Sequence, residues 1–243
     1  MIKMKRFLSF GGGVQTTFLL FKYPERYKQG GLVFANTGDE KTETYDFIEK
    51  YVKPFCIKNE ITFYEVKNSK WDSLFQKCMK SKLIPIRNRR WCTDQFKKLP
   101  IRRFYRSQGF SRKNPVHQDI GFSYDEIIRA ENQEKNKVSY VIDEYPLVDN
   151  KITRQDCAKE IIELGFPVPV KSGCWYCPFA RKEEWRQLKI KNPKLYEQAC
   201  IMEEQNRKYP NLLLKFTKPL RQIDFNNSLD DYIEGCDTGY CMK

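Results

Sequence analysis

Three consecutive glycines, Gly11, Gly12 and Gly13, separate a short apolar run from a stretch with helical periodicity. The order of strand, tight turn and helix directs the backbone N–H groups at the start of the helix toward an anion. Glycine, which has no side chain, allows a phosphate to approach the backbone closely. The segment therefore predicts a phosphate-binding loop, whose candidate contacts are Ser9, Gly11, Gly12, Gly13, Gln15, Thr16 and Thr17.

The loop follows neither of the two common phosphate-loop patterns. A Walker loop requires a Lys before the Ser or Thr, whereas Gln15 precedes Thr16 here. The dinucleotide pattern G-x-G-x-x-G fails because Thr16 occupies the position of its third glycine. The alternative interpretation is a glycine turn that binds no ligand.

Strand-length apolar runs alternate with helical stretches through the first 145 residues, which is typical of a parallel sheet. The runs are residues 6–9, 32–35, 61–66 and 116–120, and the helical stretches are residues 14–21, 42–55, 71–80 and 93–107. Right-handed crossovers place the loops after these strands along one edge, where ligands bind. We predict an α/β domain over residues 1–145, with a doubly wound, mainly parallel sheet.

The pattern changes beyond this domain. Residues 153–164, 181–191 and 193–208 have helical patterns with no clear strand between them. For residues 146–243 we predict a mainly helical, cysteine-bearing extension with a C-x-x-C metal-binding loop and a cysteine-containing tail. The chain has no internal repeat and no low-complexity segment.

The chain is strongly basic. Its 44 Lys and Arg residues against 31 Asp and Glu give a formal net charge of +13. Such a field favours a polyanionic partner, RNA or DNA, or a highly phosphorylated substrate. The alternative is a charge that only keeps the protein in solution, since the basic residues are spread along the chain.

No segment is long and apolar enough for a signal peptide or a membrane span, so we expect a cytoplasmic protein with no membrane partner. In that compartment nine cysteines indicate metal ligands or reactive thiols more than disulfides. The single histidine, His117, leaves no material for a Ser-His or Cys-His pair, and we interpret it as structural.

Four segments in order resemble the phosphoadenosine phosphosulfate (PAPS) reductase-like family of the PP-loop ATP pyrophosphatases, in the adenine nucleotide alpha hydrolase-like superfamily. The glycine loop resembles the PP-loop S-G-G-x-D-S/T, with Gly11 in place of the Ser and Gln15 in place of the acidic residue. The variant S-F-G-G-G-V-Q-S/T is known among PAPS reductase-like proteins. Residues 36–45, 89–100 and 120–129 resemble the family's D-T-G…E-T, Arg-Cys-Thr and next nucleotide-side segments.

The resemblance implies a nucleotide pocket that binds ATP with Mg²⁺. Asn36 and Thr37 would line this pocket. Basic residues of the matched segments would contact phosphate, sulfate or a nucleic-acid backbone: Arg87, Arg89, Arg90, Lys97 and Arg129. The alternative for each basic residue is a solvated surface charge.

Cys174 and Cys177 form a C-x-x-C, whose spacing lets both thiolates bind one metal ion but supplies only half a site. Cys92 and Cys157 lie in segments that resemble family motifs, and we predict that they complete the set. Four thiolates suit a [4Fe–4S] cluster or a structural zinc, and the resemblance favours the cluster.

One expected ligand is missing. Adenylylsulfate-reducing relatives bind a [4Fe–4S] cluster through a Cys-Cys pair and a distant C-x-x-C, and Trp91 replaces the first Cys of that pair. Cys157 is the predicted substitute. Cys78, or a cluster with one open iron site, is the alternative.

The remaining cysteines fall into two groups. Cys236 lies in a tail, residues 234–241, that resembles the family's Glu-Cys-Gly segment, and we predict that it is the catalytic nucleophile or a persulfide carrier. A surface thiol or a further metal site that includes Cys241 is the alternative. Cys56 and Cys200 lie in amphipathic helical patterns, where burial is the expectation.

The leading hypothesis is an ATP-dependent sulfurtransferase that adenylates its substrate, releases pyrophosphate, contains an iron–sulfur cluster and modifies a nucleic acid, with a sulfur-donor protein as a further partner. One alternative is a PAPS or adenylylsulfate reductase. A second alternative is a non-catalytic nucleic-acid-binding protein that senses a nucleotide or a cluster.

Overall fold

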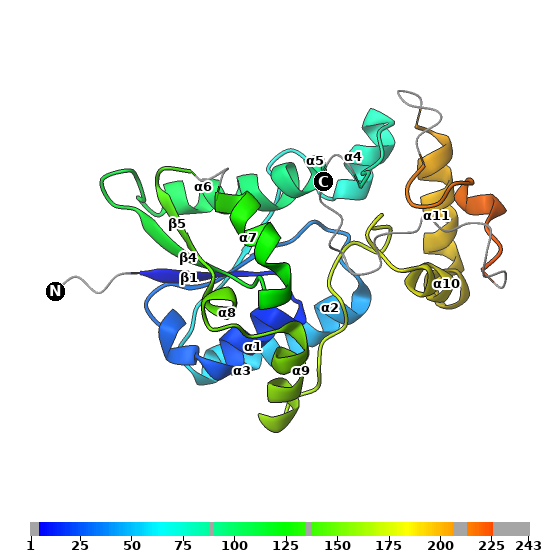
Figure 1. Ribbon diagram of the computed structural model, residues 1–243. Coiled ribbons are helices and arrows are strands. Elements are labelled where there is room, and N and C mark those ends of the chain that lie inside the picture. The colour runs from blue at the N-terminus through cyan, green and yellow to red at the C-terminus, as the bar shows by residue number, and fades with distance from the viewer. Residues whose placement is uncertain (1–4, 88–89, 135–137, 207–212, 226–243) are drawn as a thin grey trace. The chain divides into compact units, whose positions relative to one another are not determined.

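The computed structural model describes residues 5–87, 90–134, 138–206 and 213–225 (Figure 1). Within these residues, parallel strands form one sheet in the order β3-β2-β1-β4-β5. The strands are β1 (Arg6–Phe10), β2 (Gly31–Ala35), β3 (Phe63–Val66), β4 (Val116–Ile120) and β5 (Val141–Glu144). The strand order reverses between β1 and β4, and ligands of open α/β sheets bind beyond the carboxyl ends of strands at such a reversal.

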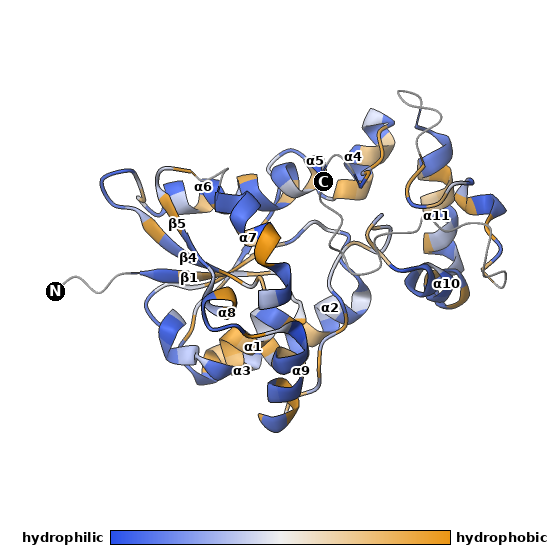
Figure 2. Ribbon diagram, viewed as in Figure 1, coloured by the Kyte–Doolittle hydropathy of each residue, from blue (hydrophilic) through white to orange (hydrophobic). Residues whose placement is uncertain are grey.

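The described residues also form α-helices. They are α1 (Val14–Lys22), α2 (Thr42–Phe47), α3 (Lys53–Lys58), α4 (Leu74–Ser81), α5 (Trp91–Thr93), α6 (Leu99–Ser107), α7 (Ile127–Glu134), α8 (Pro146–Asp149), α9 (Arg154–Glu163), α10 (Lys182–Lys191) and α11 (Pro193–Glu204). Figure 2 colours the start of α7 as hydrophobic. Ile128, in this part of the helix, is 62% exposed.

Both faces of the sheet are buried, because successive residues of a strand point to opposite faces. Leu8 of β1 packs with side chains of α1, α3 and α9 on one face. Phe7, its neighbour in β1, packs on the other face against Tyr105 of α6. This arrangement explains why all five residues of β2 are buried and why its sequence is continuously apolar.

Two long helical runs pass through a π-helical segment just before a proline. Residues Ile48–Val52 join α2 to α3, in which Pro54 is the second residue. Residues Asp94–Lys98 join α5 to α6, in which Pro100 is the second residue. Proline lacks the N–H that an α-helix requires, and the wider π turn absorbs the missing hydrogen bond.

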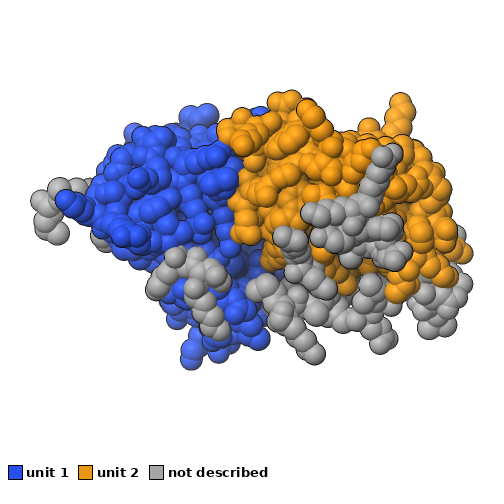
Figure 3. Space-filling view, turned by 90° about the horizontal axis from the view of Figure 1, so that it is seen from above, with its two compact units in different colours: residues 1–36, 40–67, 98–172 blue, residues 37–39, 68–97, 173–243 orange. Residues whose placement is uncertain are grey.

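The chain divides into two compact units, which Figure 3 colours separately. Unit 1 comprises residues 1–36, 40–67 and 98–172, and unit 2 comprises residues 37–39, 68–97 and 173–243. Unit 2 has its own apolar cluster, in which Phe96, Tyr176 and Trp185 are fully buried. The boundary predicted near residue 145 falls inside unit 1, and neither unit is continuous in sequence.

The predicted fold class is confirmed, with a parallel sheet and a helical C-terminal region that carries cysteines. Each predicted strand and helix matches an observed element to within a few residues. Strand β5 and helix α7 were not predicted. β5 is a four-residue edge strand with only one buried position, so its sequence V-I-D-E carries little apolar signal.

A charged network joins β1, β4 and β5 in unit 1. Asp119 is fully buried and accepts hydrogen bonds from Arg6 at 2.9 Å, from Tyr27 at 2.9 Å and from Arg26. Glu144 accepts from Arg6 and contacts His117 Nδ1 at 2.6 Å. His117 therefore has the structural role that the sequence predicts.

Strand β3 forms one edge of the sheet. A groove of about 390 Å³ runs beside it, lined by Lys53, Cys56, Ile57, Ile61, Phe63 and Glu65. The Lys53 ammonium lies 5.8 Å from the centre of the Phe63 ring, and Lys67 pairs with Glu65 at 3.1 Å. In the part of the chain that the structure describes, no helix has the length and apolar character needed to span a membrane.

Candidate functional site

The phosphate loop of unit 1 connects β1 to α1. Gly12 has φ +70°, a conformation that residues with a side chain rarely adopt. Gly13 is the N-cap of α1, and no side chain caps this end of the helix. The N–H groups of the first turn have no acceptor within the helix, so they are available to an anion.

Hydroxyl groups surround this loop. Thr16 Oγ1 donates to the carbonyl of Gly13 at 3.2 Å. Thr17 and Thr44 are buried, at 0% and 1% exposure, and neither hydroxyl has a hydrogen-bond partner among the described residues. A Cβ atom on Gly12 would lie 2.8 Å from Thr44 Cγ2, so Thr44 packs directly against the loop. Buried hydroxyls without partners are costly, and a bound phosphate would satisfy them.

Two other segments of unit 1 pack against the loop. A Cβ atom on Gly121, which follows β4, would lie 2.7 Å from Thr16 Cγ2. A Cβ atom on Gly13 would lie 3.1 Å from Ser172 Oγ. The loops after β1 and β4 therefore meet at the strand reversal, where ligands of open α/β sheets bind.

Gln15 connects the loop to two distant segments. Its Nε2 donates to Glu126 Oε2 at 2.9 Å and to Ser123 Oγ at 3.4 Å, and its Oε1 accepts from Arg154 Nη1 at 3.3 Å. Arg129 pairs with Glu126 and lies 4.5 Å from the centre of the Phe122 ring. Of the predicted basic contacts, Arg129 is therefore next to the loop.

Sequence reasoning missed several of these residues. Glu126 lies within the matched segment 120–129, so the resemblance could have identified it. Thr44 likewise lies within the matched segment 36–45. Arg154 and Ser172 carry no signal in the sequence, because only the fold brings them to the loop.

Asn36 lies at the end of β2 in unit 1. Its Nδ2 donates to Glu65 Oε1 at 3.0 Å, and its Oδ1 accepts from the Tyr45 hydroxyl at 2.7 Å. Burial alone would raise the pKa of Glu65, but hydrogen bonds from Asn36 and Lys67 outweigh it and lower that pKa. A charged Glu65 thus fixes the orientation of the Asn36 amide.

Thr37 and Asp39 belong to unit 2, where they contact the C-x-x-C loop. Thr37 Oγ1 lies 3.4 Å from Cys174 Sγ. Asp39 Oδ2 accepts from the Tyr176 hydroxyl at 2.9 Å and from the backbone N–H of Phe75 at 2.5 Å. The segment predicted to line a nucleotide pocket therefore also supports the cysteine loop.

Unit 2 contains the cysteines Cys78, Cys92, Cys174 and Cys177. Two of them, Cys78 and Cys174, are buried in the apolar cluster of this unit. Burial raises the pKa of Cys92, the neighbouring Cys177 raises it further, and Arg90 and Lys97 oppose this rise. Lys97 is therefore a neighbour of Cys92. No three His, Cys, Asp or Glu side chains of the described chain are arranged to hold a metal ion.

Cys157 lies elsewhere. It is fully buried in the apolar cluster of unit 1, and burial raises the pKa of its thiol to about 12. Its role as the fourth ligand stays a prediction. Cys56 and Cys200, each 1% exposed, are buried as predicted. Arg89 and Cys236 lie outside the residues that the structure describes.

No protein-family model matches the chain. Over 199 residues, 77% of its length, the chain is 22% identical to the uncharacterized protein MJ0973 of Methanocaldococcus jannaschii. The chain spans 45% of that protein, about half of its length.

The fold is similar to that of a phosphoadenylyl-sulfate (PAPS) reductase from Candida auris, solved as a phosphate complex. The TM-score is 0.50 at 15% identity, over 72% of this chain and 83% of that one. The U34-tRNA thiolase NcsA from Methanococcus maripaludis, solved with its [4Fe–4S] cluster, gives a TM-score of 0.46 at 19% identity, over 91% and 74% of the two chains. The first similarity establishes the fold alone, and the similarity to a PAPS reductase agrees with the resemblance predicted from the sequence.

Proposed function

We propose that the protein is an ATP-dependent sulfurtransferase that adenylates a nucleic acid, releases pyrophosphate and contains a metal centre. The observation that carries this proposal is the phosphate loop, with its uncapped helix and the buried hydroxyls of Thr17 and Thr44. The cysteine set of unit 2 adds the link to sulfur chemistry, since thiolates are the preferred ligands of iron–sulfur clusters and structural zinc.

In the first step an oxygen of the substrate attacks the α-phosphorus of ATP. A substrate O–P bond forms, the bond between the α-phosphorus and the bridging oxygen breaks, and pyrophosphate leaves with Mg²⁺. The N–H groups at the start of α1 and the threonine hydroxyls would stabilise charge on the phosphates. The loop supplies position and charge stabilisation, and no side chain of it needs to exchange a proton.

In the second step a hydrosulfide attacks the carbon that carries the adenylated oxygen. The C–S bond forms, the C–O bond breaks, and AMP leaves with that oxygen, so the substrate exchanges oxygen for sulfur with no change of oxidation state. A sulfur-donor protein would supply the hydrosulfide, and Cys236 remains the predicted carrier or nucleophile.

The donor chemistry of unit 2 fits a metal centre held by Cys92, Cys174 and Cys177. When bound, a [4Fe–4S] cluster with an open iron would bind sulfide, and zinc would have a structural role. For the fourth ligand, Cys157 and Cys78 can be compared directly by Cys→Ala substitution and anaerobic iron, sulfide and zinc analysis. Full metal content in the Cys157→Ala protein would remove Cys157 as a ligand, and loss of metal in Cys78→Ala alone would assign Cys78.

The net charge of +13 supports a nucleic acid as the substrate. Anaerobically purified protein, given ATP, Mg²⁺, hydrosulfide and either RNA or DNA, is expected to release pyrophosphate and AMP in equal amounts with thiolated nucleosides. Mass spectrometry of digested nucleosides would identify the modified class. No pyrophosphate release with either polymer would overturn the proposal.

A PAPS reductase is the second candidate, because the loop variant with Gln15 is known among PAPS reductase-like proteins. That reaction uses the nucleotide as the substrate and requires a thiol in place of ATP. Thiol-dependent release of sulfite from PAPS without ATP would establish the reductase and exclude the sulfurtransferase.

A further inference from the structure

We propose that Arg154 binds the terminal phosphates of a nucleoside triphosphate, and that Gln15 positions it. This inference rests on the proposed ATP site and adds to it the cation that the loop itself lacks. A Walker loop carries a Lys for this purpose, whereas no Lys or Arg lies between Gly11 and Phe21. Arg154 comes to the loop from a segment 139 residues away.

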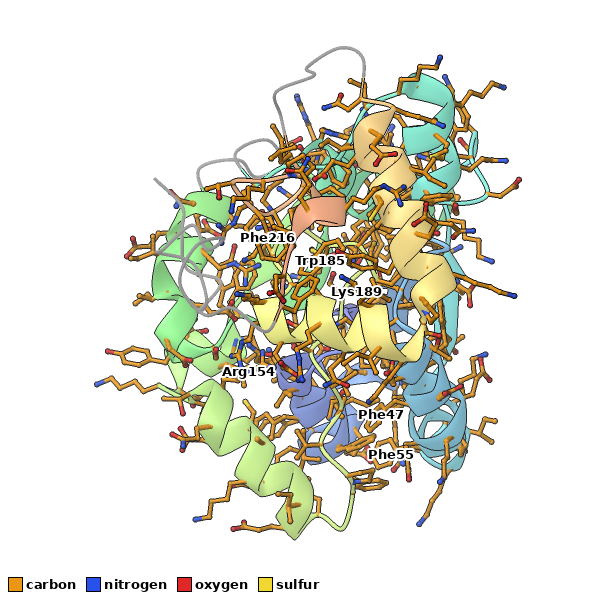
Figure 4. All side chains as sticks on the ribbon, turned by 90° about the vertical axis from the view of Figure 1, so that its right-hand side faces the viewer. Phe47, Phe55, Arg154, Trp185, Lys189 and Phe216 are labelled. Atoms are coloured by element: carbon orange, nitrogen blue, oxygen red, sulfur yellow. The ribbon has the colours of Figure 1, made fainter. Side chains whose placement is uncertain are left out.

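The backbone of Arg154 is firmly held. It is the first residue of α9, whose N-cap Thr153 forms a capping box with Asp156. Its N–H donates to Asp125 Oδ1 at 3.1 Å. Figure 4 shows Arg154 near the start of α1. The helix end and the Asp125 contact thus fix where the side chain starts.

Gln15 then fixes the position of the Arg154 guanidinium group. Gln15 is 8% exposed, and its Nε2 donates to Glu126 and Ser123, both of which accept. With the amide nitrogen committed to a carboxylate, the amide oxygen faces the opposite way and accepts from Arg154 Nη1 at 3.3 Å. Gln15 stands where a PP-loop usually has an acidic residue. Its neutral amide binds the Arg154 guanidinium and does not cancel the positive charge.

The charges around Arg154 leave its own charge available. Glu126, which holds the Gln15 amide, is itself paired with Arg129. Asp125 accepts from the backbone N–H of Arg154. A guanidinium has five N–H donors, and Gln15 uses one of its nitrogens, so further donors are available to phosphate oxygens in a bidentate manner.

An independent observation indicates a ligand at the same place. The hydroxyls of Thr17 and Thr44 are fully or almost fully buried and have no partner among the described residues. Thr44 packs on Gly12 of the loop. Phosphate oxygens above the loop would accept hydrogen bonds from the Thr44 hydroxyl, from the helix N–H groups and from Arg154.

The test is nucleotide binding by calorimetry with ATP, AMP and adenosine in the presence of Mg²⁺. Wild type is compared with Arg154→Ala, Arg154→Lys and the control Arg112→Ala, an exposed arginine of unit 1 whose Nε donates to Ser139. We expect Arg154→Ala to weaken ATP binding about 10- to 100-fold, the usual effect of removing a charge-assisted hydrogen-bonding partner. Affinity for adenosine and AMP should change less than about twofold, and Arg112→Ala should match wild type.

Gln15→Leu tests the positioning role. It should weaken ATP binding less than Arg154→Ala does, and it should have little further effect in the Arg154→Ala background, because the two side chains act through one contact. Full additivity of the two substitutions would remove the positioning role. Thermal unfolding checks that each variant folds. If Arg154→Ala does not fold, Arg154→Gln is used in its place.

The outcomes separate the two proposals. If wild type binds ATP no more tightly than adenosine, the proposed ATP site is overturned, and this inference is overturned with it. Wild type that prefers ATP, with the same preference in Arg154→Ala, would overturn this inference alone. Equal losses for adenosine and ATP in Arg154→Ala would show that Arg154 only maintains the structure.

Discussion

The phosphate loop of unit 1 and the cysteine loop of unit 2 are organised in different ways. The phosphate loop depends on backbone: a glycine with positive φ, an uncapped helix and close packing by Thr44 and Ser172. The cysteine loop depends on side chains that pack in an apolar and aromatic cluster. The phosphate loop presents uncapped helix N–H groups as it stands, whereas no three ligating side chains of the described residues gather around one point.

This difference follows from the chemistry of each ligand. An anion binds to neutral N–H and O–H dipoles, which need no change of protonation. A metal ion requires thiolates, and burial raises the pKa of Cys92 and of Cys78. A bound metal would therefore displace protons and draw the sulfurs of the proposed site together.

The largest effect should come from removing a thiol of unit 2. Cys177→Ala is expected to abolish metal binding, because structural thiolate sites contribute on the order of 10 kcal/mol and depend on every ligand. The control is Cys200→Ala, a buried cysteine of the same cluster that should cost only packing. Metal analysis per chain decides the matter, and a metal content equal to wild type in Cys177→Ala would contradict the proposed site.

The phosphate loop should be nearly as sensitive to a single methyl group. Gly12→Ala places Cβ 2.8 Å from Thr44 Cγ2 and at a positive φ, whereas a Cβ on Gly11 meets nothing within 4 Å. We expect Gly12→Ala to cost about 1–2 kcal/mol of unfolding free energy and to weaken ATP binding at least about tenfold. Gly11→Ala should do neither. Denaturant melts measure the stability and calorimetry measures the ATP affinity. If Gly12→Ala and Gly11→Ala change these quantities equally, the backbone of the loop is not preorganised.

Asp39 tests how far the cysteine loop is formed before metal binds. Asp39→Ala leaves the Tyr176 hydroxyl and the Phe75 N–H without their acceptor, at a cost of about 2–3 kcal/mol. Tyr176→Phe removes one hydroxyl and should cost about 1 kcal/mol. Both are measured by thermal unfolding of metal-free protein. Wild-type stability in Asp39→Ala would mean that the loop is unformed without metal.

The smallest effect concerns the charged network of unit 1. Burial would raise the pKa of Glu144, but hydrogen bonds from Arg6 and His117 outweigh it and lower that pKa. The folded pKa is below the unfolded one, so the stabilisation is present above about pH 4.5 and is lost as pH falls through the folded pKa. Glu144→Gln should flatten this acid loss in denaturant melts between about pH 3 and 5. An unchanged pH profile would exclude Glu144 as its source.

The sequence predicts the backbone features better than the side-chain features. The glycines and the alternation of apolar runs are local signals, and they lead to the sheet and to the loop after β1. The contacts of Gln15 with Glu126 and Arg154 join residues more than 100 positions apart, and no local pattern encodes them. Thr37 shows a further limit, since its motif indicates a nucleotide whereas its hydroxyl lies against a cysteine sulfur.

The edge of β3 affects how this chain behaves beside other copies of itself. An exposed edge strand presents unpaired N–H and C=O groups that can template a strand from a second molecule, and charged side chains discourage this pairing. Lys53, standing over Phe63, and the Glu65–Lys67 pair place both signs of charge along this edge. A second strand that docked there would have to strip water from these charges. The charges of Lys53, Glu65 and Lys67 therefore disfavour pairing of this edge with a strand of a second molecule.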